Sequence, residues 1–481
     1  MPPFLSAAPL PPGGFLSSPE AQWTAGLILA LVYAVIAFEV WHRTLAALVG
    51  GSLLLAVSAI GGYFDPGLRI LDFDIAMRAI DWNVIFLLLG MMIVVGVLKE
   101  TGVFQWCAYK AFALSGGSVF RLAALLMVLT AVASANLDNV TTMLLIAPVS
   151  IEVARVLKLN PLSLLIPEVL ASNVGGTATL IGDPPNIMIG SHAGLTYADF
   201  LVNLAPCVAL IMVVHLFQMK WVYRKDYAAR MAPAQIEELI GRLRKEYGIT
   251  NRTLLVWSGA VLAGVTLLFL LHGVFHMKVA VPALLGAGIL LIVRDRIEDK
   301  RRNVANEGPA PTEKAHGILH VLEKEVEWPT LVFFMFLFIV VEGAKQTGLI
   351  HEVAVWVKDL SAGNLTAAIL LVLFVSAIAS AIIDNIPFTA TMLPLMDVLV
   401  EGFGPEGRIL WWALALGACL GGNATIIGAS ANVVTAGIAE KAGARLTFFG
   451  FLKVGLPAMI VEVAIAAIWL LFVDPWLMGR G

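Results

Sequence analysis

Residues 175–186 read Gly175-Gly176-Thr177-Ala178-Thr179-Leu180-Ile181-Gly182-Asp183-Pro184-Pro185-Asn186, and they interrupt a long apolar segment. Two prolines that follow glycines cannot continue a helix, so backbone carbonyl and N–H groups are freed at this point. Irregular backbone inside a membrane persists only where it is buried in protein or lines a polar cavity. The segment at 162–189 therefore predicts a discontinuous membrane helix at a functional site.

The composition of the whole chain indicates a membrane protein. Of its 481 residues, 59% are hydrophobic and 14% are charged, whereas about one quarter of a soluble domain is charged. These values exclude an ordinary soluble enzyme, a nucleic-acid-binding protein and a disordered chain. The three cysteines, Cys107, Cys207 and Cys419, are far apart and have no metal-ligand spacing. We expect no metal centre, no cofactor and no enzymatic activity.

Apolar segments long enough to cross a bilayer recur along the chain. We predict an all-α polytopic protein with ten spans and two re-entrant hairpins, which leave the membrane on the side where they entered. The spans cover 24–40, 44–60, 82–98, 162–189, 199–222, 253–272, 278–293, 328–345, 410–438 and 449–473. The hairpins cover 120–156 and 366–400, and each has a polar, non-helical centre.

The distribution of basic residues predicts the orientation in the membrane. With both termini outside, the inner loops hold 24 of the 31 Lys and Arg residues, as the positive-inside rule requires. The first 22 residues lack the basic start of a secretory signal, so we expect an uncleaved first span in the cell (inner) membrane. Ile236, Leu239, Ile240 and Leu243 recur at helical spacing. They predict either an amphipathic helix on the membrane surface or a solvated linker helix.

The sequence repeats itself after 246 positions. Asp138-Asn139 matches Asp384-Asn385, and 175–182 matches 421–428 at six of eight residues, with no insertion over about one hundred residues. Each repeat holds five spans and one hairpin, and because five is odd the second copy is predicted to be inverted. Inverted repeats with paired helix breaks are typical of secondary transporters, whose site lies near the membrane midplane. The predicted regions are a tail at 1–22, a first repeat at 23–222, a linker at 223–252 and a second repeat at 253–475, which contains the charged cytoplasmic loop 294–327.

Each hairpin carries an Asp-Asn pair near its centre. A carboxylate at membrane depth is costly and indicates a functional site. Asp138 and Asp384 are therefore predicted to take up and release a proton or a sodium ion, while Asn139 and Asn385 supply donors and acceptors beside them. The alternative is structural, because Asp is also a good N-cap for the second arm of a hairpin.

The two helix breaks are predicted to differ. In the second copy Ala429 replaces Asp183, and no proline follows, so that break is expected to be milder. Asp183 would add a proton-handling carboxylate to the first side, or it would only cap a half-helix. The roles of Glu342 and Cys419 stay open. The candidate substrate- or ion-binding residues are Asp138, Asn139, Thr177, Thr179, Asp183, Asn186, Asp384, Asn385, Gly422, Asn423, Thr425 and Asn432, and those for proton coupling are Asp138, Asp384 and Asp183.

These motifs resemble the ion transporter superfamily over nearly the whole chain. The stretch 137–142 together with 175–186 is similar to the branch that holds arsenite permeases of the ArsB type, NhaD-type sodium/proton antiporters and the melanosomal P protein. The resemblance implies paired hairpins opposite unwound helices, an elevator movement of a transport domain, and a homodimer. Related sodium/dicarboxylate symporters carry Ser-Asn-Thr at the hairpin tips. Here Asp138 and Asp384 replace that Ser, and their negative charge argues against a dicarboxylate cargo.

We therefore expect a proton-coupled antiporter that exports arsenite or antimonite, with the bilayer, a second copy and a soluble ATPase subunit as possible partners. The alternative is a sodium/proton antiporter that uses the same carboxylates. A sodium-coupled carboxylate or anion transporter, a channel and an intramembrane aspartyl protease are less favoured hypotheses. No nucleic-acid partner is expected.

Overall fold

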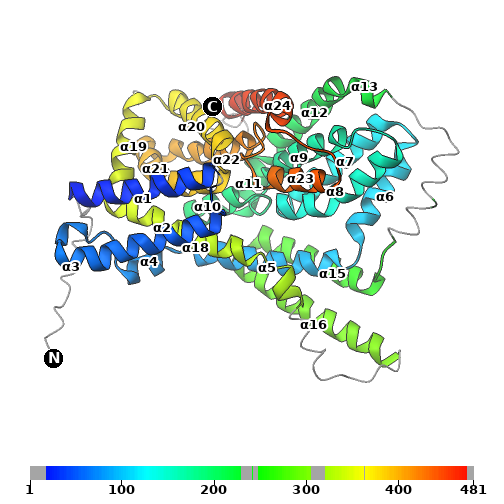
Figure 1. Cartoon of the computed structure of the whole chain (residues 1–481), viewed down its shortest axis with the longest axis horizontal. Coiled ribbons are helices and arrows are strands. Elements are labelled where there is room, and N and C mark those ends of the chain that lie inside the picture. The colour runs from blue at the N-terminus through cyan, green and yellow to red at the C-terminus, as the bar shows by residue number, and fades with distance from the viewer. Residues whose placement is uncertain are drawn as a thin grey trace.

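The computed structural model describes residues 18–38, 40–228, 241, 248–304, 320–361 and 363–473. Most of the predicted tail, of the predicted helix around 236–243 and of the middle of the 294–327 loop lies outside this range, as does Glu39. The regular secondary structure of the described part is helical throughout (Figure 1). Ten of its helical stretches are long and apolar enough to cross a membrane, so the chain is an integral membrane protein.

The helices of the first half confirm most predicted segments, and they add α4 and α6, which lie in predicted loops. Their bounds are α1 (Pro19–Ala37), α2 (Arg43–Ala56), α3 (Gly62–Phe64), α4 (Phe73–Ala79), α5 (Trp82–Lys99), α6 (Val103–Ser115), α7 (Val119–Ser134), α8 (Asn139–Val156), α9 (Leu162–Gly176), α10 (Pro184–Ala193), α11 (Tyr197–Asn203), α12 (Ala205–Val222) and α13 (Arg224–Tyr227). Short segments of π-helix (Val57–Gly61) and 3₁₀-helix (Pro66–Leu68) join α2 to α4.

The second half repeats this order, and it adds α19 in a predicted loop. Its helices are α15 (Arg252–Leu271), α16 (Ala280–Val304), α18 (Trp328–Gln346), α19 (Leu349–Leu360), α20 (Leu365–Ile382), α21 (Asn385–Phe403), α22 (Ile409–Gly421), α23 (Ser430–Lys441) and α24 (Phe448–Ile468). A 3₁₀ turn (Gly404–Arg408) precedes α22, and a π-helical turn (Trp469–Val473) follows α24. The repeat distance of 246 separates the first residues of α5 and α18, of α8 and α21, and of α10 and α23.

A helix pair with a turn at the Asp-Asn step is present at each predicted hairpin, and both predicted breaks are present; re-entry of the hairpins stays a prediction. Asp138 caps α8 by accepting a hydrogen bond from the Thr141 N–H at 2.8 Å, and Asp384 caps α21 by accepting from the Ile386 N–H at 3.0 Å. Helix α9 ends at Gly176, and residues 177–183 separate it from α10. Helix α22 ends at Gly421, and residues 422–429 separate it from α23. The second break is therefore not milder, and that expectation is wrong. It persists without prolines because side-chain hydrogen bonds hold its backbone, as described below.

Helices α5 and α18, which are equivalent in the repeat, run in opposite directions. Lys99 at the end of α5 pairs with Glu325 just before α18, at 3.0 Å. At the other end, Asp81 before α5 and Lys345 near the end of α18 line one cavity. In Figure 1 the α7–α8 pair lies at the right and the α20–α21 pair at the left. This antiparallel course supports the predicted inversion of the second repeat.

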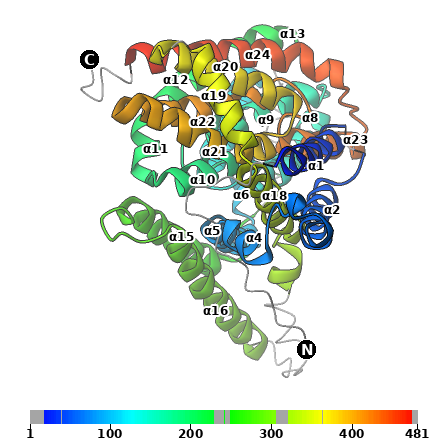
Figure 2. The same cartoon turned by 90° about the vertical axis from the view of Figure 1, so that its left-hand side faces the viewer.

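The first helices of each half pack on the other half. A Cβ on Gly50 of α2 would lie 3.6 Å from Val340 of α18, and one on Gly286 of α16 would lie 3.7 Å from Val94 of α5. Val94 and Val340 are equivalent positions, 246 residues apart. Helices α1, α2, α5, α15, α16 and α18 thus form a two-sided support, named here the frame, and α15 and α16 stand out from it in Figure 2.

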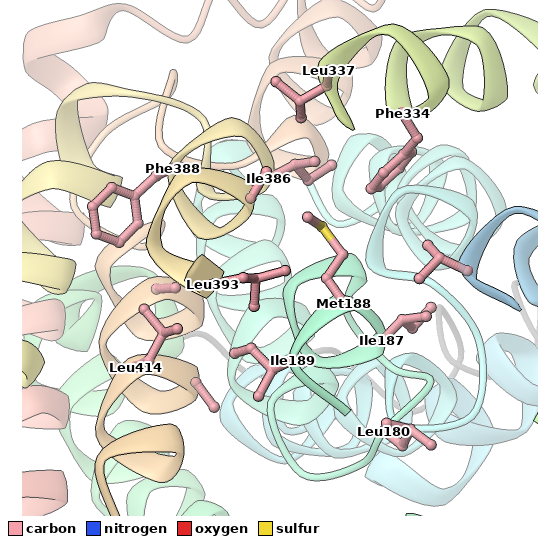
Figure 3. Close-up of a cluster of buried hydrophobic side chains, with 14 of the residues drawn as sticks. Leu180, Ile187, Met188, Ile189, Phe334, Leu337, Ile386, Phe388, Leu393 and Leu414 are labelled. Atoms are coloured by element: carbon pink, nitrogen blue, oxygen red, sulfur yellow. The ribbon is translucent and has the colours of Figure 1, made fainter. Parts of the chain in front are cut away.

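The hairpins and broken helices (α7–α10 and α20–α23), named here the hairpin unit, pack against the frame through apolar side chains. Figure 3 shows this cluster, with Phe334 and Leu337 of α18 beside Ile386 of α21 and Met188 of α10. Burial of such side chains is favourable by roughly 25 cal/mol per Å² without fixing a direction. The interface therefore holds the two units together while leaving few directional contacts between them.

Candidate functional site

Each helix break is bonded to the tip of its own hairpin. The Thr179 hydroxyl donates to the Ala135 carbonyl at 2.5 Å, and the Thr425 hydroxyl donates to the Ala381 carbonyl at 2.6 Å. The same two hydroxyls accept hydrogen bonds from Gly182 N–H and Gly428 N–H, at 3.1 and 3.0 Å. Tip and break are thus joined by hydrogen bonds in each half.

Two buried asparagines close the breaks. The Asn186 Nδ2 donates to the carbonyls of Thr177 and Thr179 at 3.1 and 2.9 Å. In the second half the Asn432 Nδ2 donates to the carbonyls of Gly422 and Thr425, both at 2.8 Å. These amides satisfy carbonyls that the missing helical turns leave open, which buried backbone requires. The sequence places these residues at the site, and their side chains hold its backbone; their contact with a substrate stays a prediction.

The two hairpin tips meet at Asp183, which is fully buried. The Asn139 Nδ2 donates to its Oδ1 at 3.4 Å, and the Asn385 Nδ2 donates to its Oδ2 at 3.3 Å. The equivalent position in the second half is Ala429, so one carboxylate serves both tips. Burial of a charged carboxylate is costly, and two neutral amide donors offset only part of that cost, so a proton or a cation at Asp183 would be stabilising.

Arg43 is a site residue that sequence reasoning missed. Its Nη1 lies 3.1 Å from the Asp384 carboxylate and also donates to the Ser430 hydroxyl, which itself donates to Asp384 at 2.9 Å. The guanidinium stacks 5.4 Å from the centre of the Phe333 ring, a favourable cation–π geometry. The positive-inside count places Arg43 among the basic residues of the inner loops. Its position at the first residue of an apolar helix is the signal that could have indicated this role.

Asp138 has no such cation. Among the described residues it forms no ion pair, although it lines a cavity of about 20 Å³ together with Arg43, Asp183 and Glu327. A space of this size holds about one water-sized particle. In the part of the chain that the structure describes, no three His, Cys, Asp or Glu side chains are grouped closely enough to hold a metal ion. The cavity therefore has more carboxylates than cations.

A second asparagine cluster extends from the site. Asn173, also missed by sequence reasoning, accepts from the Asn139 Nδ2 at 3.2 Å, and its own Nδ2 donates to Asn423 Oδ1 at 2.9 Å and Asn432 Oδ1 at 3.0 Å. Asn423 in turn donates to Glu462 at 2.7 Å. These contacts cross between the two repeats. Asn173 lies in α9 beside Ser172 and two residues before Gly175, and its closeness to the break is the signal that could have indicated it.

Cys419 and Glu342, whose roles the sequence leaves open, lie at different places in the structure. Cys419 is fully buried, and its Sγ lies 3.5 Å from Asn186 Oδ1, so it reaches the edge of the site. Glu342 accepts from Gln346 at 2.6 Å and lies 3.9 Å from Lys345, beside an outer cavity of about 540 Å³. Glu342 therefore lies outside the cluster of carboxylates.

A model of the citrate transporter family, CitMHS, matches residues 33–417. The chain belongs to the citrate transporter family. An uncharacterized transporter of Mycobacterium bovis is 41% identical over 92% of this chain and 96% of its own length. The P protein of Sus scrofa is 37% identical over 95% of this chain, which spans 60% of that protein. These matches confirm the resemblance to the ion transporter superfamily.

The fold of this family member is also that of a solved transporter. The YdaH transporter of Alcanivorax borkumensis aligns with a TM-score of 0.62 over 92% of this chain and 99% of its own, at 15% sequence identity. At this identity the likeness concerns the fold alone. The chain is thus a membrane transporter of the citrate transporter family, and the family match favours transport over an enzymatic activity.

Proposed function

We propose that the chain is a secondary active transporter that exchanges protons for a small neutral cargo, with arsenite or antimonite as its substrate. The observation that carries the proposal is the convergence of both hairpin tips on the buried Asp183. A carboxylate shared by two mobile tips couples its protonation to their positions. The proposal includes alternating access by elevator movement, a homodimer in the cell membrane, and both termini outside.

Proton coupling follows from the charge balance of the cavity. Arg43 compensates Asp384, whereas Asp138, Asp183 and Glu327 share the same small space. Charged carboxylates in a low-dielectric site repel one another by several kcal/mol. Protons or a bound cation must therefore neutralise this excess. A proton can be delivered to Asp138 or Asp183 from one side of the membrane and released to the other.

A neutral cargo fits the same balance better than an anion does. Arsenite is a small uncharged trihydroxy species near pH 7, and it needs hydrogen-bond donors and acceptors rather than a counter-charge. The amides of Asn139 and Asn385 lie at the cavity and can provide both. Citrate is a multiply charged anion, and the uncompensated Asp138 and Asp183 would repel it. We therefore do not propose citrate, the substrate in the family's description, as the cargo of this chain.

One observation favours the alternative of a sodium/proton antiporter. The cavity of about 20 Å³ admits a single ion or water without rearrangement, whereas arsenite requires the tips to open. Asp138, Asp183, Asn139 and Asn385, whose side chains all carry oxygen atoms, line that space. Sodium favours such oxygen ligands. The two proposals share the coupling residues and differ only in the cargo.

Transport by purified protein in proteoliposomes tests both. We expect arsenite to accumulate on the acidic side of an imposed pH gradient, and Asp138→Asn to abolish the dependence on that gradient. Glu440→Gln removes an exposed carboxylate from α23 and is the matched control. A pH dye that responds to sodium and not to arsenite would favour the alternative. Arsenite flux that ignores both the gradient and Asp138→Asn would contradict proton coupling.

A further inference from the structure

The two ends of the frame differ although the repeat makes them equivalent. Asp81 before α5 matches Glu327 before α18. At the Glu327 end the hairpin unit is docked, and it leaves a cavity of about 20 Å³. At the Asp81 end a hollow of about 580 Å³ lies open, lined by residues that include Asp81, Asn83, His192 and Lys278. The hollow is named here the Asp81 hollow.

Arg43 lies at the first of these ends, and both Lys278 and Arg78 line the hollow at the other, where Lys278 has the position closest to that of Arg43. Arg43 precedes Gly50 by seven residues, and Lys278 precedes Gly286 by eight. The two glycines are equivalent, because they pack on Val340 and Val94, which match in the repeat. Lys278 therefore lies within one residue of the position that corresponds to Arg43. Arg43 faces the docked hairpin unit, whereas Lys278 lines the hollow.

We propose that Lys278 replaces Arg43 as the docking cation when the hairpin unit moves into the Asp81 hollow, where it pairs with Asp138. This inference rests on the alternating access of the proposed function. By the same symmetry, Asp384 then leaves Arg43. Each carboxylate is thus paired with the frame in one state and free to hold a proton or a transported cation in the other.

The geometry fits a movement of this kind. Asp138 lies in a cavity lined by Leu88 and Met92 in the middle of α5, while Asn83 of α5 lines the hollow with Lys278. Five to nine residues of helix separate these positions, which is about 10 Å at 1.5 Å per residue. The apolar contacts of Figure 3 can be exchanged along such a path.

Among the described residues, few polar contacts between the frame and the hairpin unit must break for this movement. On the docked side, Tyr33 of α1 donates to the Pro387 carbonyl at 2.6 Å, and Arg43 holds Asp384 and Ser430. On the hollow side, Asn83 donates to Ser191 of α10 at 2.9 Å. Arg43 supplies the ion pair between frame and unit at the site, so it is the contact whose loss shifts the balance most.

Two cysteine reporters test the exchange without any substrate. Ala79→Cys lines the hollow, which is open here, and Thr330→Cys lines the closed cavity. The rate of alkylation by a hydrophilic maleimide is measured for each reporter in full-length protein in nanodiscs, with Cys107→Ser removing the half-exposed native thiol. We expect Arg43→Gln to slow alkylation at Ala79→Cys and to accelerate it at Thr330→Cys. Lys278→Gln should do the reverse.

A change of about tenfold in the ratio of the two rates is expected, which corresponds to about 1.4 kcal/mol. Arg121→Gln, which removes an exposed cation from α7, should change neither rate. General loosening would accelerate both reporters, so shifts of the same sign, or no shift, would overturn the proposal. The alkylation assay uses no cargo, so a failure of arsenite or sodium transport would not change its result. Equally, a failure of the alkylation assay would not contradict the transport of either cargo.

Discussion

The two hairpin tips share a sequence motif and a backbone, but their surroundings differ. At the second tip, Asp384 contacts Arg43 and Ser430 within hydrogen-bond distance. At the first tip, Asp138 accepts a hydrogen bond from the Thr141 N–H and forms no ion pair among the described residues, and Pro184 occupies the position equivalent to Ser430. The repeat therefore gives both tips the same backbone geometry, whereas the frame provides a cation for Asp384 and none for Asp138 among the described residues.

The two breaks show the same division. Thr179 and Thr425 make matching hydrogen bonds, as do Asn186 and Asn432. Asp183, in contrast, has Ala429 as its counterpart. The residues that hold the backbone are duplicated, and so are the tip aspartates, whereas Asp183 has no acidic counterpart. Asp183 is the carboxylate that contacts the asparagines of both tips, so in the proposed function it is the place where protonation affects both.

The largest effect is expected at Asp183. Asp183→Asn keeps the shape and removes the charge that the two tip asparagines share, so we expect proton-coupled transport to fall by at least about a hundredfold. Such a change corresponds to about 2.7 kcal/mol of lost coupling. Initial rates in proteoliposomes under a fixed pH gradient measure it. The control Ala429→Ser alters the equivalent position without charge, and transport that survives Asp183→Asn would disprove this role of Asp183.

The next largest effect is a difference in stability between variants of the two tips. Asp384→Asn keeps the helix cap but leaves Arg43 without its anion, and both groups are only partly exposed. Removing one member of a buried ion pair costs 3–5 kcal/mol, and the partial exposure of Arg43 lowers our expectation to about 2 kcal/mol. Asp138→Asn breaks no ion pair and should cost less than about 0.5 kcal/mol.

Unfolding of the two variants in the same nanodiscs provides the comparison. The double variant Arg43→Gln with Asp384→Asn should recover most of the stability that Asp384→Asn loses, because no unpaired charge remains. Equal losses for Asp138→Asn and Asp384→Asn, or no recovery in the double variant, would show that the ion pair does not distinguish the tips.

The sequence predicts the features that are local or repeated. The Asp-Asn pairs, the Gly-Gly breaks and the distance of 246 residues indicate the hairpins, the breaks and the site, because each interrupts an apolar pattern. Arg43 and Asn173 escape this reasoning, since their roles depend on contacts with residues 341 and 250 positions away. Helices α6 and α19 are missed because they are shorter than a membrane span. The absence of proline predicts a milder second break, whereas the side chains of Thr425 and Asn432 hold that break open.

The smallest effect is expected where a break is bonded to its hairpin tip, a contact that both halves share. Thr179→Val and Thr425→Val each remove one hydroxyl that joins a break to its hairpin tip, at nearly equal distances of 2.5 and 2.6 Å. Each change leaves a carbonyl and an N–H without this partner, so we expect a loss of about 1–2 kcal/mol in the free energy of unfolding. The two losses should agree within about 0.5 kcal/mol, as measured by thermal or denaturant unfolding in the same lipid. Ser118→Ala, which removes an exposed cap of α7, gives the scale of an ordinary hydroxyl. A loss confined to one of the two threonines would mean that the second repeat copies the sequence of the first but not its mechanical role.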